Sequence, residues 1–368
     1  MEHEFTQVIK SLLQNVFRDR SELIYSMSPI LQYINVKTRA ANRGSKARNS
    51  FGNLYAIYVL VEDYVKKGFD ESGQYNFYEG SKYSELLRRQ RELPFGQKLQ
   101  NHALNHRLNQ EFKKYFPTCD YIPVIRESSN NRYWFNENLL LCITEDNIYN
   151  LGAIIIKIID KYIETKIDAF ENFINSCEQI NQLVEANQNE AVDFIVELLQ
   201  PNVDARLFEI VSYSILKYYY YEQTIFFGFD MQDIQQENLK LYKTGRTNAN
   251  DGGIDFVMKP LGRFFQVTET TDFKKYFLDI DKIEKYPITF VIKATENTDK
   301  LLQKIRKKAE QQYSVNLIVD KYIDCIEEII NLPILRERFK HAVEMGYLGN
   351  ILEEIIKQSK VEFNYNFI

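Results

Sequence analysis

Residues 248–270 read NANDGGIDFVMKPLGRFFQVTET, and this stretch decides the fold of the second half of the chain. Two glycines precede a lone aspartate, Asp255, at the start of a short apolar segment. KPLG then carries proline and glycine at the positions that a type I turn favours, and RFFQVTE follows it. We predict a β-hairpin whose register brings Asp255 beside Gln266 at its open end.

The sequence around the hairpin predicts further helices and strands. VDARLFEIVSYSILKYYY is typical of a helix that begins near Asp204, and a polar connection at about 228–240 separates it from the hairpin. The predicted order is therefore helix, three strands, helix and strand. Beyond the hairpin, the predicted elements are the strand ITFVIKA, the helix DKLLQKIRKKAEQQY, the short strand VNLIVD, and helices over Lys321–Asn331 and Leu335–Lys357.

The first 200 residues have a different pattern, which is mostly helical. Apolar residues recur at helical spacing in FTQVIKSLLQNVF, in FGNLYAIYVLVEDYV after a possible N-cap at Ser50, and in LGAIIIKIIDKYIETKIDAFENFI. Two short strands are predicted near Tyr121–Arg126 and Tyr133–Asn136. We therefore predict an α+β or α/β protein, with a helical domain at 1–200 and a second domain at 201–368.

Composition sets limits on the class of protein. The chain has 368 residues, 45% of them hydrophobic, and a net charge of -5, so no overall basic field indicates nucleic-acid binding, although a local basic face would suffice. Its apolar runs are too short to span a bilayer, and its first residues, MEHEFTQVIK, lack a signal peptide. Four dispersed cysteines are typical of reduced thiols, so we expect a cytoplasmic protein with no membrane partner.

The hairpin also predicts a metal site. Asp255 and the amide oxygen of Gln266 are hard oxygen ligands, which favour Mg²⁺ over zinc. Side chains alternate along a strand, so Thr268 shares a face with Gln266 while Glu269 points to the other. Glu209, a lone acid among apolar residues of the preceding helix, is a candidate third ligand.

These residues resemble a known family. LFEIVSY, KTGRTNANDGGIDFVM and RFFQVTE are similar to the PD-(D/E)XK nuclease superfamily, and within it to the Mrr-like group, over about residues 204–320. The resemblance implies a mixed central sheet flanked by helices, with Asp255, Gln266 and Glu209 as magnesium ligands. With a helical N-terminal half, the chain resembles a type II restriction endonuclease. This implies Mg²⁺-dependent cleavage of double-stranded DNA at a short specific sequence, a homodimer, and a cognate DNA methyltransferase in the same system that is not a bound subunit.

One departure from the family pattern leaves alternatives open. The family usually has lysine two residues after the Glu or Gln of this strand, and here the residue is Thr268. Thr268 or Glu269 could organise the attacking water, or the chain could be a catalytically inactive DNA-binding relative. A nuclease that requires modified DNA is a further alternative. A lysine from elsewhere could also complete the site, the candidates being Lys243, Lys259, Lys274 and Lys293.

Two basic stretches are candidates for DNA binding. NVKTRAANRGSKARNSFG contains five basic residues and no acid, and the loop before the hairpin is also basic. Such side chains would contact phosphates, and the asparagines would read base edges. The predicted DNA-binding residues are Lys37, Arg39, Asn42, Arg43, Lys46 and Arg48 in the first stretch, and Arg246 and Asn248 in the second.

Overall fold

A computed structural model describes the chain except for residues 1, 42–45, 98, 146, 185, 245–253, 270 and 364–368, and without the side chains of residues 40–50 and 363. The described chain divides into two compact units. Unit 1 comprises Met1–Phe173 and the residues from Glu362 on, and unit 2 comprises Ile174–Val361. The division falls inside the long helix α9, Gly152–Leu183, and so earlier than the boundary near residue 200 that the sequence predicts.

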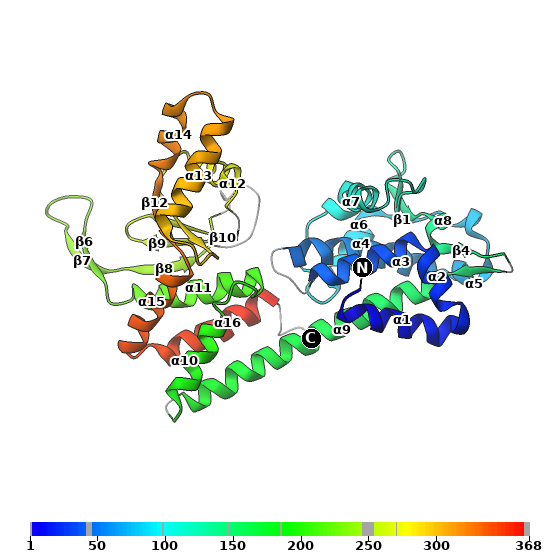
Figure 1. Ribbon diagram of the computed structural model, residues 1–368, viewed down its shortest axis with the longest axis horizontal. Coiled ribbons are helices and arrows are strands. Elements are labelled where there is room, and N and C mark those ends of the chain that lie inside the picture. The colour runs from blue at the N-terminus through cyan, green and yellow to red at the C-terminus, as the bar shows by residue number, and fades with distance from the viewer. Residues whose placement is uncertain are drawn as a thin grey trace. The chain divides into compact units, whose positions relative to one another are not determined.

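Unit 1 is mainly helical (Figure 1). Its longest helices are amphipathic, and their apolar faces form one core around the almost continuously buried Phe51–Val61 segment of α4. Its elements are α1 (Glu4–Phe17), η1 (Arg18–Arg20), α2 (Ser21–Met27), α3 (Pro29–Ala41), α4 (Lys46–Lys66), α5 (Phe69–Ser72), η2 (Tyr75–Phe77), β1 (Ser81–Lys82), α6 (Tyr83–Glu92), η3 (Ala103–Arg107), α7 (Leu108–Tyr115), β2 (Val124–Glu127), β3 (Arg132–Phe135), α8 (Glu137–Leu140), β4 (Leu141–Ile143), β5 (Ile148–Asn150) and the first part of α9.

Unit 2 combines helices with a five-stranded sheet (Figure 1). Asp204 is the N-cap of its helix α11, as the sequence predicts, because the Asp204 carboxylate accepts a hydrogen bond from the Arg206 backbone. The elements are α10 (Gln188–Glu197), α11 (Ala205–Tyr219), β6 (Thr224–Phe227), β7 (Gln235–Asn238), β8 (Lys240–Lys243), β9 (Phe256–Lys259), β10 (Arg263–Thr268), α12 (Phe273–Lys282), β11 (Ile288–Ile292), α13 (Thr298–Gln312), α14 (Asn316–Ile323), β12 (Ile326–Ile330), α15 (Leu332–Glu344) and α16 (Leu348–Phe363).

The sheet of unit 2 is mixed, with the strand order β12-β11-β10-β9-β8. β8, β9 and β10 form an antiparallel meander, whereas β10, β11 and β12 run parallel. The parallel strands need helical crossovers, which α12 and the α13–α14 pair supply. As a result, the carboxyl ends of β8, β10 and β11 lie at the same edge as the start of β9.

Helices cover both faces of this sheet. Tyr213 of α11 contacts the ring of Phe256, and Tyr220, the residue that caps the end of α11, contacts the ring of Phe265. α11 therefore lies on the face to which these phenylalanines point. The opposite face belongs to a second core that includes Phe290 and the buried residues of α12 and α13. Alternation along β10 therefore places Phe265 and Val267 towards α11, and Phe264, Gln266 and Thr268 towards α12 and α13.

The predicted mixture of helices and strands is confirmed, with corrections in detail. VNLIVD is not a strand but most of helix α14, and the last strand is β12, within a segment predicted to be helical. The connection at 228–240 contains strand β7, and β8 precedes the hairpin as an additional strand. Ser50 lies inside α4, which begins at Lys46, and is therefore not its N-cap.

The turn of the β9–β10 hairpin also differs from the prediction. A type I turn at 259–262 would place a hydrogen bond from Gly262 to Lys259, but the Gly262 N–H donates to the carbonyl of Met258 instead, at 2.9 Å. Gly262 has a φ of 69°, which glycine adopts without steric cost. The predicted alignment of the strands survives, because Met258 pairs with Arg263 and Phe256 with Phe265.

Candidate metal-binding and catalytic site

Asp255 lies at the open end of the β9–β10 hairpin and is held by the backbone of β10. Its N–H donates to the Phe265 carbonyl at 3.0 Å, and its Oδ2 accepts a hydrogen bond from the Val267 N–H at 2.8 Å. The Asp255 carboxylate thus accepts the hydrogen bond from β10 that a backbone carbonyl of the neighbouring strand would otherwise accept. A side chain held in this way has a fixed orientation beside Gln266, the residue between its two backbone partners.

The next residue of the candidate site is Gln266, whose side-chain amide is almost completely buried. The side chain is 7% exposed, and its Oε1 is buried with no hydrogen-bond partner among the described residues. Its Nε2 makes a long contact of 3.4 Å with the Val267 carbonyl. An unpaired buried amide oxygen costs about 1–3 kcal/mol, so this position favours a ligand that accepts electron density from oxygen.

Thr268 follows Gln266 on the same face, as the sequence predicts. It is 4% exposed and pairs in register with Ile292 of β11. Its carbonyl accepts a hydrogen bond from the Lys293 N–H at 3.0 Å. The residue in the position of the family lysine is therefore a buried part of the sheet.

Glu209 of α11 forms an ion pair with Lys243 at the end of β8. The Lys243 Nζ and a Glu209 carboxylate oxygen are 3.2 Å apart, and the side chains are 14% and 12% exposed. Lys243 pairs in register with Phe256, directly after Asp255, and the Thr244 N–H donates to the Asp255 carbonyl at 3.0 Å. Lys243 thus comes from the strand beside Asp255.

A second ion pair joins Glu269, just after β10, to Lys293, just after β11. Lys293 is 6% exposed, and its Nζ also donates to the Val203 carbonyl at 2.5 Å, near the start of α11. Of the other candidate lysines, Lys259 lies at the turn end of the hairpin and Lys274 is exposed on α12. Lys243 and Lys293 are thus the two candidates that the structure brings to the edge of Asp255.

The sheet separates these groups into two sets. Glu209 is on the α11 side, whereas Gln266 and Thr268 point to the α12 side, so the structure does not gather Glu209 with Gln266 as the sequence predicts. Among the described residues there is no group of three or more His, Cys, Asp and Glu side chains placed to hold a metal.

A magnesium ion nevertheless fits Asp255 and Gln266 chemically. One supplies a carboxylate and the other an uncharged amide oxygen, and the Gln266 oxygen is buried and orphaned. Magnesium is held in proteins by one or two such groups, with water completing its coordination. Glu209 is already neutralised by Lys243, so it is the least suited of the three predicted ligands.

The structure describes the side chains of only two of the predicted DNA-binding residues in unit 1. Lys37 is 4% exposed, and its Nζ binds the partly exposed Glu111 carboxylate at 2.7 Å, so this predicted DNA contact is engaged in an ion pair within unit 1. Arg39 is partly exposed near the end of α3. The other predicted contacts lie outside the described residues or side chains: Asn42, Arg43, Lys46, Arg48, Arg246 and Asn248.

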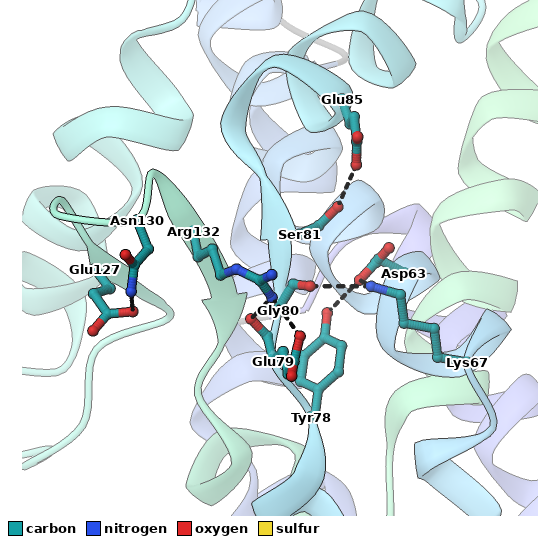
Figure 2. Close-up of polar contacts among 10 residues, drawn as sticks. All are labelled: Asp63, Lys67, Tyr78, Glu79, Gly80, Ser81, Glu85, Glu127, Asn130 and Arg132. Atoms are coloured by element: carbon teal, nitrogen blue, oxygen red, sulfur yellow. Dashed lines mark hydrogen bonds and ion pairs between the residues drawn. The ribbon is translucent and has the colours of Figure 1, made fainter.

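Sequence reasoning missed a hollow of about 380 Å³ in unit 1, next to β1. Figure 2 shows that its polar groups bind one another: Lys67 reaches Asp63 and the Gly80 carbonyl, and Arg132 reaches Glu79. Lys67 and Arg132 are thus already engaged, and the remaining lining cation, Lys82, is an exposed side chain accompanied by the acids Glu79 and Glu85, so the lining does not select an anionic ligand. No local motif signals this hollow, because its lining comes from several separate elements.

Comparisons with known proteins add no relative. No family model, no curated protein and no solved structure matches the chain. In the described part of the chain, no helix is long and apolar enough to cross a membrane.

Proposed function

We propose that this chain is a Mg²⁺-dependent endonuclease of the type II restriction kind, which hydrolyses phosphodiester bonds of double-stranded DNA at a short specific sequence. The observation that carries the proposal is the pairing of an anchored carboxylate with an orphaned buried oxygen. The β10 backbone fixes Asp255, and the neighbouring Gln266 oxygen lacks a partner among the described residues.

The order of elements supports the same proposal. After α11 the chain forms the separate β6–β7 hairpin and then continues through β8, β9 and β10, α12 and β11. Apart from that inserted hairpin, this is the helix–three strands–helix–strand order of the nuclease family that the sequence resembles. In this arrangement Asp255 lies at the start of the second strand and Gln266 in the third. Fold order alone does not establish chemistry, so the proposal depends on the residues at the open end of the hairpin.

The chemistry assigns a part to each residue. A bound magnesium ion would lower the pKa of a coordinated water and offset the charge that develops on the phosphate. Asp255 and Gln266 would hold it, and the Val267 N–H would keep the carboxylate in one orientation. Lys243, from the adjacent strand, is the group that we assign to the phosphate charge in place of the missing lysine at Thr268.

A second candidate, a catalytically inactive DNA-binding relative, is favoured by one observation. Each lysine near Asp255 is paired with a carboxylate, Lys243 with Glu209 and Lys293 with Glu269. If those pairs persist when DNA binds, neither lysine would neutralise a phosphate. This alternative predicts specific binding without cleavage in Mg²⁺ or Mn²⁺.

The test compares Asp255→Asn and Asp255→Ala with the wild type on unmethylated phage DNA, with Mg²⁺ and with EDTA. Asparagine keeps an oxygen for the Val267 N–H but removes the charge, so it separates loss of metal binding from loss of structure. We expect discrete fragments from the wild type in Mg²⁺ only, and a loss of at least about 10²-fold in both variants.

Asp193→Asn, on the exposed face of α10, is the matched control and should cleave normally. Equal cleavage by Asp255→Asn and the wild type would refute the assigned site. Intact DNA binding with no cleavage by the wild type in either metal would replace the proposal with the inactive relative.

A further inference from the structure

A β-hairpin projects from unit 2 between α11 and β8, and we call residues 221–239 the hairpin arm (Figure 1). The arm consists of β6 and β7, which form a two-stranded sheet of their own. Three of its large apolar side chains largely face solvent, whereas Leu239 at its base is buried. Phe226 is 77% exposed, Phe229 96% and Met231 85%.

An isolated hairpin with these exposed side chains is expected to be only marginally stable without a partner surface. A two-stranded hairpin is marginally stable in water unless it packs against something, and clustered exposed apolar side chains mark interaction surfaces. The arm closes on itself through the Phe227–Phe229 ring contact and a bond from Gln236 to Thr224. Those contacts leave Phe226, Phe229 and Met231 uncovered.

The charge of the arm indicates what covers it. Four acidic residues occur among residues 221–239, and no basic residue does. DNA phosphates would repel this surface, so the arm is not a DNA wedge despite its aromatic tip. A partner should instead offer exposed apolar groups beside positive charge. The acids are Glu222, Asp230, Asp233 and Glu237.

The same chain offers such a surface elsewhere on unit 2. Residues 311–318, which we call the α13–α14 corner, are all exposed and contain no acid. The exposed face of α13 carries lysines directly before it, and Figure 1 shows that the arm and α14 project from separate parts of unit 2. The flanking acids Glu310 and Asp320 are paired with Arg306, and Lys304 is paired with Glu296. The apolar residues of the corner are Tyr313, Val315, Leu317 and Ile318, and the nearby exposed lysines that the proposal uses are Lys307 and Lys308.

We infer that the hairpin arm docks on the α13–α14 corner of a second copy of this chain. The acidic, apolar arm and the basic, apolar corner are complementary in both charge and polarity. In a two-fold dimer each arm reaches the other subunit's corner, so that the contact forms twice and closes. Cleavage of both DNA strands, as in the proposed function, calls for a homodimer, and the inference identifies the surface that joins its two subunits. It therefore rests on the proposed function.

The test is sedimentation velocity of the full chain over a range of concentrations, without DNA or metal. The arm variant is Asp230→Lys with Asp233→Lys, and the corner variant is Lys307→Glu with Lys308→Glu. We expect a wild-type dimer, a dimer dissociation constant at least about tenfold higher in each variant, and near wild-type dimerisation when all four changes are combined. Phe77→Glu, at a side chain 73% exposed on unit 1, is the control that should change nothing.

Three outcomes would overturn the inference. A monomeric wild type is one, and unchanged dimerisation of the arm variant is another. The third is a combined variant that dimerises as weakly as the arm variant or the corner variant, because the arm and the corner would then act separately. Since no DNA is present in the sedimentation runs, failure here is distinct from failure of the proposed cleavage.

Discussion

Replacing Gln266 with methionine should make the protein more stable and less active at the same time. Methionine has about the same length and fills the same buried volume without an amide. The change removes the Oε1 atom, which is buried with no partner among the described residues. It also removes the weak Nε2 contact with the Val267 carbonyl, at 3.4 Å.

The structure sets the size of the effect. An unsatisfied buried polar atom costs about 1–3 kcal/mol, whereas a hydrogen bond as long as 3.4 Å contributes little. We therefore expect Gln266→Met to raise the free energy of unfolding by about 1–2 kcal/mol in EDTA. For a domain of this size that corresponds to a rise in Tm of roughly 2–8 °C.

Thermal melting with and without Mg²⁺ provides the assay. A ligand at one hundred times its Kd stabilises the folded state by about 2.7 kcal/mol, so Mg²⁺ should raise the Tm of the wild type. It should raise the Tm of Gln266→Met much less, and DNA cleavage by the variant should fall by at least about 10²-fold.

Gln90 in unit 1 offers a matched control. It is fully buried, its Oε1 also lacks a partner among the described residues, and its Nε2 binds the Gly52 carbonyl at 3.2 Å. Gln90→Met should change stability in EDTA but leave the Mg²⁺ response and cleavage untouched. The reasoning fails if Gln266→Met melts below the wild type in EDTA, or if Mg²⁺ stabilises both equally.

Three further predictions concern other residues. Lys243→Met should lower the cleavage rate by about 10²-fold at saturating Mg²⁺, because Lys243 is the group assigned to the phosphate charge, and an unchanged rate would remove Lys243 from the site. Burial raises the pKa of Glu354, but the hydrogen bonds from Lys217 and Gln358, together with the positive charges of Lys217 and Lys357, outweigh burial and leave the pKa below its ordinary value of 4.5. Its contribution to stability is therefore present above about pH 4.5 and lost below, and Lys217→Met should begin acid unfolding at a higher pH, as circular dichroism would show. Burial raises the pKa of Cys177 to about 12, so its thiol should resist a thiol reagent at pH 8 until the protein unfolds. Rapid labelling of Cys177 in the native protein, located by peptide mapping because Cys119 is partly exposed, would contradict this.

The elements with strong periodicity could be predicted from sequence. α1, α9 and α11 follow the helical spacing of their apolar residues, and the β9–β10 hairpin follows its turn signal. The last strand could not. Glu327 and Glu328 make the β12 segment polar in the sequence, which does not suggest a strand. In the folded sheet their carboxylates bind Arg263 of β10, a partner that the sequence alone does not identify. VNLIVD is a short apolar run, for which periodicity does not separate strand from helix.

The same limit applies to the site. Sequence reasoning placed Asp255 beside Gln266, and the hydrogen bonds of Asp255 to the β10 backbone agree with that placement. It could not anticipate that Glu209 pairs with Lys243 or that the sheet separates Glu209 from Gln266. Both findings depend on which residues of each strand face α11, and the packing of the whole sheet determines this.

The separation by the sheet has a consequence for how this protein could change during evolution. The pairs Glu209–Lys243 and Glu269–Lys293 each balance one charge against another, so in related sequences we expect the two members of a pair to vary together or to exchange sign. Among the described residues, the Gln266 Oε1 atom on the other face has no polar partner of this kind. In related sequences, we expect Gln266 to vary together with Asp255 instead. A sequence that has lost one of these two residues should rarely retain the other.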